Sequence, residues 1–298
     1  MMQPIYPVDV EEIDTLIDCA LAEDLGSCGD ATANSIIDAD MHSEADWVAK
    51  EPGVLCGLFV AERVFRKIDS RLACAFNLED GHAVEPGTLF GKVSGPVRGI
   101  LSGERTALNF LQHLSGISTL TSEFVRRVYG TGVHILDTRK TTPGLRVLEK
   151  YAVRVGGGIN HRFGLYDRIL IKNNHIDAAG GIRPAVTQCL EFLKEKHWDY
   201  RIEVETRTLD EVREVLRHPV HRIMLDNMDI GTMKKAVALV ADRVEIEASG
   251  NITLENVRAV AETGVRFISV GRLTHSAPNL DLSLRIRPRS VVQEDGHD

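Results

Sequence analysis

The sequence predicts an α/β protein in which a turn-rich α+β region precedes a series of parallel βα units. Between about residues 43 and 101, short alternating segments are separated by Pro-Gly, Asp-Gly and Gly-Pro turns, a pattern typical of antiparallel strands. From residue 133 onward, six short apolar runs alternate with helical patterns, which indicates parallel strands joined by helices. The length of 298 residues fits one barrel-sized domain or two domains of ordinary size.

The first region begins with a helix over about residues 10–25. Asp9 is the expected N-cap, with Glu12 as its capping-box partner, and Gly26 ends the helix. The apolar residues at helical spacing predict its buried face: Val10, Ile13, Ile17 and Leu21. Strands are expected at 44–51, 53–57, 72–78, 88–95 and 97–101, and a helix over about 59–68 interrupts them. Two further helices are expected over about 102–114 and 117–129.

The second region contains the six predicted parallel strands. They are residues 133–137, 168–172, 201–205, 222–226, 244–248 and 267–271. Their spacing from the third strand onward is about 20 residues, which is close to the rhythm of a βα barrel. These residues fit an incomplete barrel, and they also fit a doubly wound sheet.

Each predicted strand of the second region ends in polar or small residues. The set is Asp137, Thr138, Arg139 and Lys140; Lys172; Glu205; Asp226; Ser249, Gly250 and Asn251; and Gly271 and Arg272. Because the carboxyl ends of parallel strands meet at one edge, we expect these residues to converge there. His161 and Arg162 follow three glycines at 156–158, and we expect them to form an anion clamp beside this edge.

These residue types suggest two ligands. The cations suit a carboxylated substrate. The carboxylates of Glu205 and Asp226 suit Mg²⁺ carrying a phosphorylated substrate, and the glycine turns suit phosphate. The residues therefore predict a metal-assisted reaction between a phosphorylated sugar and an organic acid. For Glu205, a structural salt bridge with Lys172 is the alternative.

Charge and cysteine content exclude several other classes of protein. The net charge is −8, so nucleic acid and anionic membranes are poor partners. The window from Arg139 to Lys172 contains eight basic and two acidic residues, so it carries a net charge of +6. Within it, the spacing of Arg146, Lys150 and Arg154 predicts a solvated helix face. The sequence contains no apolar run of 18 residues and no signal sequence, and its five cysteines include no C-x-x-C pair. We therefore expect a cytoplasmic protein without a disulfide framework.

Several long segments resemble the quinolinate phosphoribosyltransferase family, also called nicotinate-nucleotide pyrophosphorylase (carboxylating). They are GERTALNFLQHLSGIST at 103–119, the run from DTRKTTPG to KNNHI at 137–176, EVET at 203–206, MLDNM at 224–228, EASGNIT at 247–253 and SVGRLTHSAPNLDLSL at 269–284. The resemblance covers nearly the whole chain in the expected order, and the central segment is highly specific.

The resemblance implies an N-terminal α+β sandwich domain, residues 1–112 joined by residues 277–298, and an open, incomplete TIM-like α/β barrel at 113–276. It also implies conversion of quinolinate and phosphoribosyl pyrophosphate to nicotinate mononucleotide, pyrophosphate and CO₂ with Mg²⁺, in NAD biosynthesis. The expected assembly is a homodimer with shared active sites, or a higher homo-oligomer.

The resemblance also assigns roles to the strand-end residues. Arg139, His161, Arg162 and Lys172 would hold the two carboxylates of quinolinate, and Arg105 would reach the same ligand from a partner subunit. Thr138 and Lys140 would lie beside the substrates, and Lys140, Lys172, Glu205 and Asp226 would be the catalytic residues. Glu205 and Asp226 would hold Mg²⁺ directly or through water or substrate. Ser249, Gly250, Asn251, Gly271 and Arg272 would line the phosphate end; Asn251 differs from some relatives, which carry glycine there.

Two alternatives remain at this stage. A sister enzyme on the same scaffold would be ModD-like or would use a pyridine monocarboxylate such as nicotinate. One carboxylate needs fewer cations than Arg105, Arg139, His161, Arg162 and Lys172 supply together, which favours the dicarboxylate. A non-catalytic ligand-binding protein is the alternative from another class, and six polar strand ends argue against it.

Overall fold

The computed structural model describes residues 10–287 and divides them into two compact units. The first unit contains residues up to Thr119 together with the segment from Pro278, and the second contains Leu120–Ala277. The expected cap Asp9 lies outside the described residues. No helix of the described part is long and apolar enough to cross a membrane. All five cysteines are free.

The first unit is built on an antiparallel sheet with the strand order β12-β1-β5-β3. Its strands are β1 (His42–Ala49), β3 (Ala73–Phe76), β5 (Leu89–Pro96) and β12 (Leu282–Ile286), and β2 (Gly53–Val54) pairs separately with β4 (Ala83–Val84). Its helices are α1 (Val10–Leu25), α2 (Ala31–Ile36), α3 (Leu58–Ile68) and the first part of α4 (Val97–Arg127). The late strand β12 pairs with β1, so the chain returns to the first unit after the second is complete.

The core of the first unit is centred on Trp47 of β1. Its ring lies 5.9 Å from Phe65 of α3 and 6.0 Å from Phe90 of β5, measured between centroids. All three side chains are fully buried. Burial of such large rings is a main source of stability where a helix packs on a sheet.

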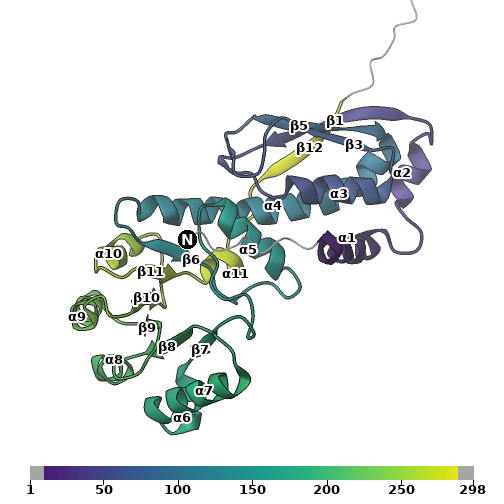
Figure 1. Cartoon of the computed structure of the whole chain (residues 1–298). Helices are drawn as coiled ribbons and strands as arrows, with labels where there is room; N and C mark the ends of the chain where they lie inside the picture. Colours follow the sequence, from purple (N-terminus) through teal and green to yellow (C-terminus); the bar gives the residue numbers. More distant parts are fainter. Residues whose placement is uncertain (1–9, 288–298) are drawn as a thin grey trace, which may run out of the picture. The chain divides into compact units, whose positions relative to one another are not determined.

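The second unit contains a six-stranded parallel sheet with the order β6-β11-β10-β9-β8-β7. The strands are β6 (His134–Leu136), β7 (Ile169–Ile171), β8 (Ile202–Thr206), β9 (Arg222–Asp226), β10 (Glu245–Ser249) and β11 (Phe267–Ser269). The helices between them are α5 (Arg146–Val155), α6 (Asn173–Ala179), α7 (Ile182–Lys196), α8 (Leu209–Val215), α9 (Ile230–Val240) and α10 (Val257–Ala261), and α11 (Arg272–His275) follows β11. Helices α8, α9 and α10 lie along one side of the curved sheet (Figure 1).

This strand order decides between the two predicted architectures. Neighbouring strands follow chain order, and the first strand, β6, lies beside the last, β11. That is the order of a βα barrel, and the barrel is open because β6 and β7 do not pair within the described residues. The predicted α/β class with an open barrel is therefore confirmed.

Two predictions about the first region are wrong. Residues 97–101 begin helix α4 rather than forming a strand, and α4 continues through Gly116 to Arg127 as one helix instead of two. A Cβ added at Gly116 would lie 2.0 Å from the carbonyl oxygen of Pro278. The glycine therefore allows a close backbone contact within the first unit and does not break the helix. In α1, Ile13, Ile17 and Leu21 are buried as predicted, but Val10 is exposed.

Candidate active site at the strand ends

One face of the barrel sheet carries most of the charged residues, and we call it the charged face. Alternate residues of a strand share a face, so Glu203 and Glu205 of β8 lie on the same side. The register aligns Glu203 with Arg222 and Ser249 with Asp226. Charges on this face therefore form rows, and the last row lies at the carboxyl ends of the strands.

Four predicted cations lie at or beside these strand ends without a carboxylate partner. Arg139, Lys140, Arg162 and Lys172 form no salt bridge within the described residues. Arg162 is only 7% exposed, and burial followed by the charge of Arg139 lowers the pKa of its guanidinium. The Nε atom of Arg139 is buried and lacks a hydrogen-bond partner in the same part of the chain. Buried cations in this state are costly without a counterion, so the arrangement favours an anionic ligand.

A buried ion pair holds the backbone that carries these cations. The Nζ atom of Lys150 donates to Asp137 at 2.5 Å and to the carbonyl of His161 at 3.1 Å. Asp137 also accepts from Asn160 at 2.5 Å and from the backbone amide of His161 at 2.8 Å. Lys150 is therefore buried, and the prediction of a solvated face on α5 is wrong for it. Its stem lies in the core because the strand-end carboxylate provides a partner there.

Arg146, on the same helix, is also not simply solvated. Its guanidinium donates to Thr141 at 3.0 Å and to the carbonyl oxygen of Phe163 at 3.2 Å. The carboxylate of Asp167 accepts from the amides of Phe163 and Gly164, at 2.7 and 2.9 Å. These contacts fix the turn that follows Arg162.

His161 does not present a free donor to the strand ends. Its Nδ1 atom accepts the backbone amide of Arg162 at 2.7 Å. Its Nε2 atom lies 3.1 Å from Glu203 and 3.5 Å from Glu247. Burial lowers the pKa of His161, but Glu247 and Glu203 together outweigh it and raise that pKa. The predicted direct contact of His161 with a substrate carboxylate would require the ring to leave these partners.

The two predicted catalytic carboxylates influence one another. Glu205 is the penultimate residue of β8 and is almost fully buried, and Asp226 is the last residue of β9 and is partly exposed. Burial and then the charge of Asp226 raise the pKa of Glu205, whereas Lys172 and the amide of Asn173 lower it. The backbone amide of Lys172 itself donates to Nδ1 of His175 at 2.9 Å. Two neighbouring carboxylates with one nearby lysine fit a divalent cation or a developing positive charge.

The turn after β10 requires its glycine. Gly250 has φ +94°, and a Cβ there would lie 2.1 Å from Oδ1 of Asn227. The same Oδ1 atom accepts from the side chain of Asn251 at 3.0 Å. Asn251 has φ +53°, a conformation that asparagine tolerates better than most residues. Asparagine can therefore stand where some relatives carry glycine.

The loop after β6 is tied to the loop after β11. The hydroxyl of Thr274 donates to the carbonyl of Lys140 at 2.7 Å, and the amide of Lys140 donates to Thr138 at 3.0 Å. A Cβ on Gly271 would approach Cδ of Lys140 to 3.1 Å, so the lysine stem crosses this glycine. Arg272 is exposed at the start of α11. Arg105 lies on an exposed part of α4 in the first unit, and its contact with the strand-end residues stays a prediction.

Sequence reasoning missed a buried charged cluster that lies on the same face, beneath the strand ends. It consists of His161, Glu203, Arg222 and Glu247, all buried. Arg222 donates to Glu247 at 2.8 Å and to Glu245 at 3.1 Å. Burial acts to raise the pKa of Glu247, but His161 and Arg222 lower it to about 2. The sequence did contain a signal for this cluster, namely the charged residues on one face of RIEVE, RIMLD and VEIEA. Buried parallel strands are usually hydrophobic on both faces, so charged residues within them indicate a buried polar cluster.

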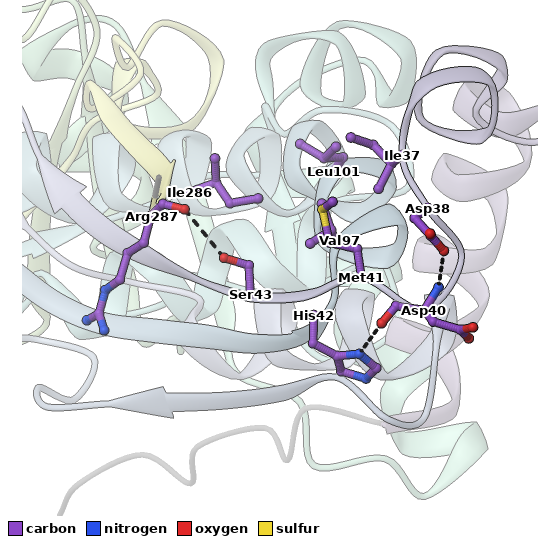
Figure 2. A pocket seen from close by; sticks show the side chains of 10 residues that line it. All are labelled: Ile37, Asp38, Asp40, Met41, His42, Ser43, Val97, Leu101, Ile286 and Arg287. Atoms are coloured by element: carbon purple, nitrogen blue, oxygen red, sulfur yellow. Dashed lines mark hydrogen bonds between the residues drawn. The ribbon is translucent and has the colours of Figure 1, made fainter. Parts of the chain in front are cut away.

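A separate cavity of about 620 Å³ lies in the first unit. Its apolar lining comes from Ile37, Met41, Val97, Leu101 and Ile286, and its polar lining comes from Asp38, Asp40, His42, Ser43 and Arg287. Figure 2 shows the hydrogen bond from the hydroxyl of Ser43 to the carbonyl oxygen of Arg287, and the hydrogen bond between Nδ1 of His42 and the carbonyl oxygen of Asp40. None of the residues predicted to bind substrate lines this cavity.

The fold and the strand-end residues define a two-unit protein with an open α/β barrel and a group of unpaired cations at its strand ends. Family models agree with this description and are more specific. The N-terminal domain of quinolinate phosphoribosyl transferase matches residues 30–115, and its C-terminal domain matches residues 117–285. The chain belongs to the quinolinate phosphoribosyltransferase family.

Individual relatives and solved structures are similar along most of the chain. Quinolinate phosphoribosyltransferase (decarboxylating) 2, mitochondrial, from Nicotiana glauca is 44% identical over 95% of this chain and 84% of its own length. The chloroplastic nicotinate-nucleotide pyrophosphorylase (carboxylating) of Arabidopsis thaliana is 47% identical, over 92% and 83% of the two chains. The structure of the Francisella tularensis nicotinate-nucleotide pyrophosphorylase matches with a TM-score of 0.90 and 38% identity, over 96% of this chain and 100% of that one. Human nicotinic acid phosphoribosyltransferase, at 13% identity and a TM-score of 0.59, shares the fold alone.

Proposed function

We propose that this protein transfers the phosphoribosyl group of phosphoribosyl pyrophosphate to quinolinate and releases pyrophosphate and CO₂. The product is nicotinate mononucleotide, which serves NAD biosynthesis. Family membership supports the reaction. The observation that carries the choice of a dicarboxylate is the group of unpaired cations around the buried Arg162.

The quinolinate subsite would be formed by Arg139, Arg162 and Lys172. Each can donate charge-assisted hydrogen bonds to a carboxylate, and Arg162 lies in a region from which water is largely excluded. Lys140, with Thr138 beside it, would face the ribose and pyrophosphate. The turns at Ser249–Asn251 and Gly271–Arg272 would receive the 5′-phosphate through backbone amides.

The chemistry needs no protein nucleophile. As the bond from C1 of the ribose to pyrophosphate breaks, positive charge develops on the sugar ring, and Glu205 and Asp226 can offset it. The pyridine nitrogen forms the new bond to C1. The nitrogen then carries a positive charge, so the C2 carboxylate leaves as CO₂ and the electron pair left on C2 is stabilised before it takes a proton. Lys140 stabilises the charge on the departing pyrophosphate, and the protein otherwise positions the two substrates.

Magnesium fits the same carboxylates. Asp226 raises the pKa of Glu205, so the two groups are close enough to repel, and oxygen ligands of this kind are those that Mg²⁺ prefers. Glu205 and Asp226 would hold the ion, directly or through water or substrate. When bound, Mg²⁺ would neutralise part of the pyrophosphate charge.

A labelled-carboxyl assay tests the proposed function. Quinolinate labelled at the C2 carboxylate should yield labelled CO₂ only when phosphoribosyl pyrophosphate and Mg²⁺ are both present. Omitting either one, or adding a chelator, should stop release. Nicotinate in place of quinolinate tests the alternative of a monocarboxylate enzyme, and faster turnover with nicotinate would replace the proposal with that alternative.

The proposal includes a cytoplasmic homodimer in which Arg105 completes the site of the partner subunit. In a two-fold dimer, each first unit can supply residues to the other subunit. Inactive Arg105→Ala and Lys172→Ala subunits should therefore regain activity when they exchange. Random mixing in equal amounts makes about half the dimers mixed, and each mixed dimer has one intact site, so about a quarter of all sites should work. A mixture that stays inactive, with exchange confirmed by mass, would mean that Arg105 is not shared.

A further inference from the structure

The buried cluster below the strand ends links the sheet to the predicted anion clamp. His161 contacts Glu203 at 3.1 Å and Glu247 at 3.5 Å through Nε2, and Glu203 is 1% exposed. Nε2 of His161, both oxygens of Glu203 and Oε1 of Glu247 lack a hydrogen-bond partner among the described residues, so these contacts are ionic. Buried polar groups without hydrogen-bond partners indicate either a ligand-binding site or a structural role that depends on their charge.

A metal site is the first interpretation to test, because one histidine and two glutamates converge within 4.8 Å. The hydrogen bonds argue against it. In this geometry Nδ1 of His161 accepts the amide of Arg162, which places the ring proton on Nε2, the atom that a metal would need. In addition, Arg222 donates to Glu247 at 2.8 Å, and Arg168 lies 3.9 Å from Glu203. Two arginines beside the carboxylates already supply positive charge.

We propose that Glu203 and Glu247 act through His161 to position Arg162 for the dicarboxylate substrate. The charges of the two carboxylates, 3.1 and 3.5 Å from Nε2, favour a proton on that atom, and Nδ1 accepts the Arg162 amide at 2.7 Å. His161 is then a positioning residue and does not itself touch quinolinate. This inference rests on the proposed function, because it concerns the quinolinate subsite.

The cluster reaches Arg162 at a second point. The guanidinium Nη1 of Arg162 donates to the carbonyl of Arg168 at 3.3 Å, and the side chain of Arg168 lies near Glu203. Both the backbone and the guanidinium of Arg162 are thus tied to the row that contains Glu203. The loop of Lys140 is held separately by Thr274, so the effect should fall on quinolinate and not on the sugar phosphate.

The first experiment compares two glutamate-to-glutamine variants. Glu203→Gln keeps the shape of the side chain and removes its charge. We expect the KM for quinolinate to rise about tenfold, because the charged contact between Glu203 and Nε2 of His161 is lost, while the KM for phosphoribosyl pyrophosphate stays unchanged. Glu245→Gln is the matched control, because Glu245 pairs with Arg222 and Arg201 in the same network and is not paired with His161. Its quinolinate KM should match that of the wild type.

The second experiment replaces the histidine. The Oδ1 atom of His161→Asn can take the place of Nδ1 and accept the Arg162 amide, whereas His161→Ala cannot. We expect the Asn variant to recover most of the quinolinate affinity that the Ala variant loses, measured by calorimetry on variants whose folding is checked by thermal denaturation. The two His161 variants still test the inference if Glu203→Gln does not fold.

Three results would overturn the inference. One is an equal loss of quinolinate affinity in His161→Asn and His161→Ala, which would indicate direct contact of the ring with the substrate. Another is an unchanged quinolinate KM in Glu203→Gln. The third is a stoichiometric metal in the purified wild-type protein that is lost in Glu247→Gln. If the wild type did not consume quinolinate at all, the proposed function itself would fail, and that outcome is separate.

Discussion

Two groups of charged residues on and beside the charged face of the barrel differ in how their charges are paired. In the buried cluster, Arg222 pairs with Glu245 and Glu247, and His161 contacts Glu203. At the strand ends and the adjoining loop, Arg139 and Arg162 have no carboxylate partner within the described residues. An unpaired buried cation is expensive, whereas a paired one is close to neutral in free energy. Charged residues that support the barrel are therefore paired within the protein, whereas the cations at the strand ends lack a protein partner and are available to an anionic ligand.

The same contrast separates Lys150 from Lys172. Lys150 is buried and pairs with Asp137 at 2.5 Å, so it stabilises the loop after β6. Lys172 is exposed at the end of β7 and influences Glu205 only through its charge. Substitutions of the paired residues should therefore mainly change stability, and substitutions of the strand-end residues should mainly change binding or turnover.

The largest effect should come from the strand-end carboxylates. Glu205→Ala or Asp226→Ala should lower kcat by about 100-fold, because each group acts on charge that develops in the transition state. The KM values should change much less. Steady-state kinetics at saturating Mg²⁺ measures this, with Glu191→Gln on the exposed surface of α7 as the control. Wild-type turnover in either variant would remove that residue from the catalytic group.

Removing a paired residue from the buried scaffold should chiefly cost stability. Lys150→Ala leaves Asp137 buried without its partner, so the free energy of unfolding should fall by about 3–5 kcal/mol. Arg213→Ala breaks an exposed pair with Asp210 on α8 and should cost less than about 1 kcal/mol. Urea unfolding followed by circular dichroism compares the two. Equal losses would show that burial does not distinguish these pairs.

The strand-end residues could be predicted from sequence, and the buried cluster could not. The parallel order brings Glu205, Asp226 and Ser249 to one edge whatever the details of packing, so the strand pattern alone locates them. Whether His161 reaches Glu203 depends on how the loop after α5 folds back over the sheet. That path is fixed by Asp137, which bonds to the His161 amide across 24 residues of sequence.

Tertiary contact also decided the elements that were predicted incorrectly. Gly116 resembles a helix break in sequence, but the carbonyl of Pro278 lies against it in the first unit. Lys150 resembles one member of a solvated cationic stripe, yet Asp137 draws it into the core. In both cases the deciding partner is distant along the chain or on another element, where local spacing gives no information.

An unpaired cation should matter for binding more than for stability. Arg162→Ala should weaken quinolinate binding by about 1.5–3 kcal/mol, which is about tenfold or more, because a charge-assisted contact to a carboxylate is lost. Binding of phosphoribosyl pyrophosphate should change little. Isothermal titration calorimetry with each substrate gives both numbers, and Arg213→Ala serves as the control arginine. Unchanged quinolinate affinity would exclude Arg162 from the subsite.

The smallest effect concerns the pKa of Glu205. Burial and the charge of Asp226 raise that pKa above the ordinary value of 4.5, so the carboxyl should take up a proton at a higher pH than an exposed glutamate. Carbon-13 NMR of labelled glutamate carboxyls in the metal-free protein should detect raised midpoints for Glu104, Glu203 and Glu205, and the one that is missing in Glu205→Gln belongs to Glu205. In Asp226→Asn the like charge is gone, and the midpoint should move down.

The raised pKa of Glu205 predicts the direction in which kcat changes with pH. If ionised Glu205 offsets the charge on the ribose, kcat should fall as the pH falls through its raised pKa. The acid limb of the kcat profile should then lie above pH 4.5 in the wild type and move to lower pH in the residual activity of Asp226→Asn. Both enzymes use the same substrates, so substrate ionisation contributes equally to the two profiles. Coincident acid limbs would mean that Asp226 does not control the charge of Glu205, and the strand-end carboxylates would then act independently.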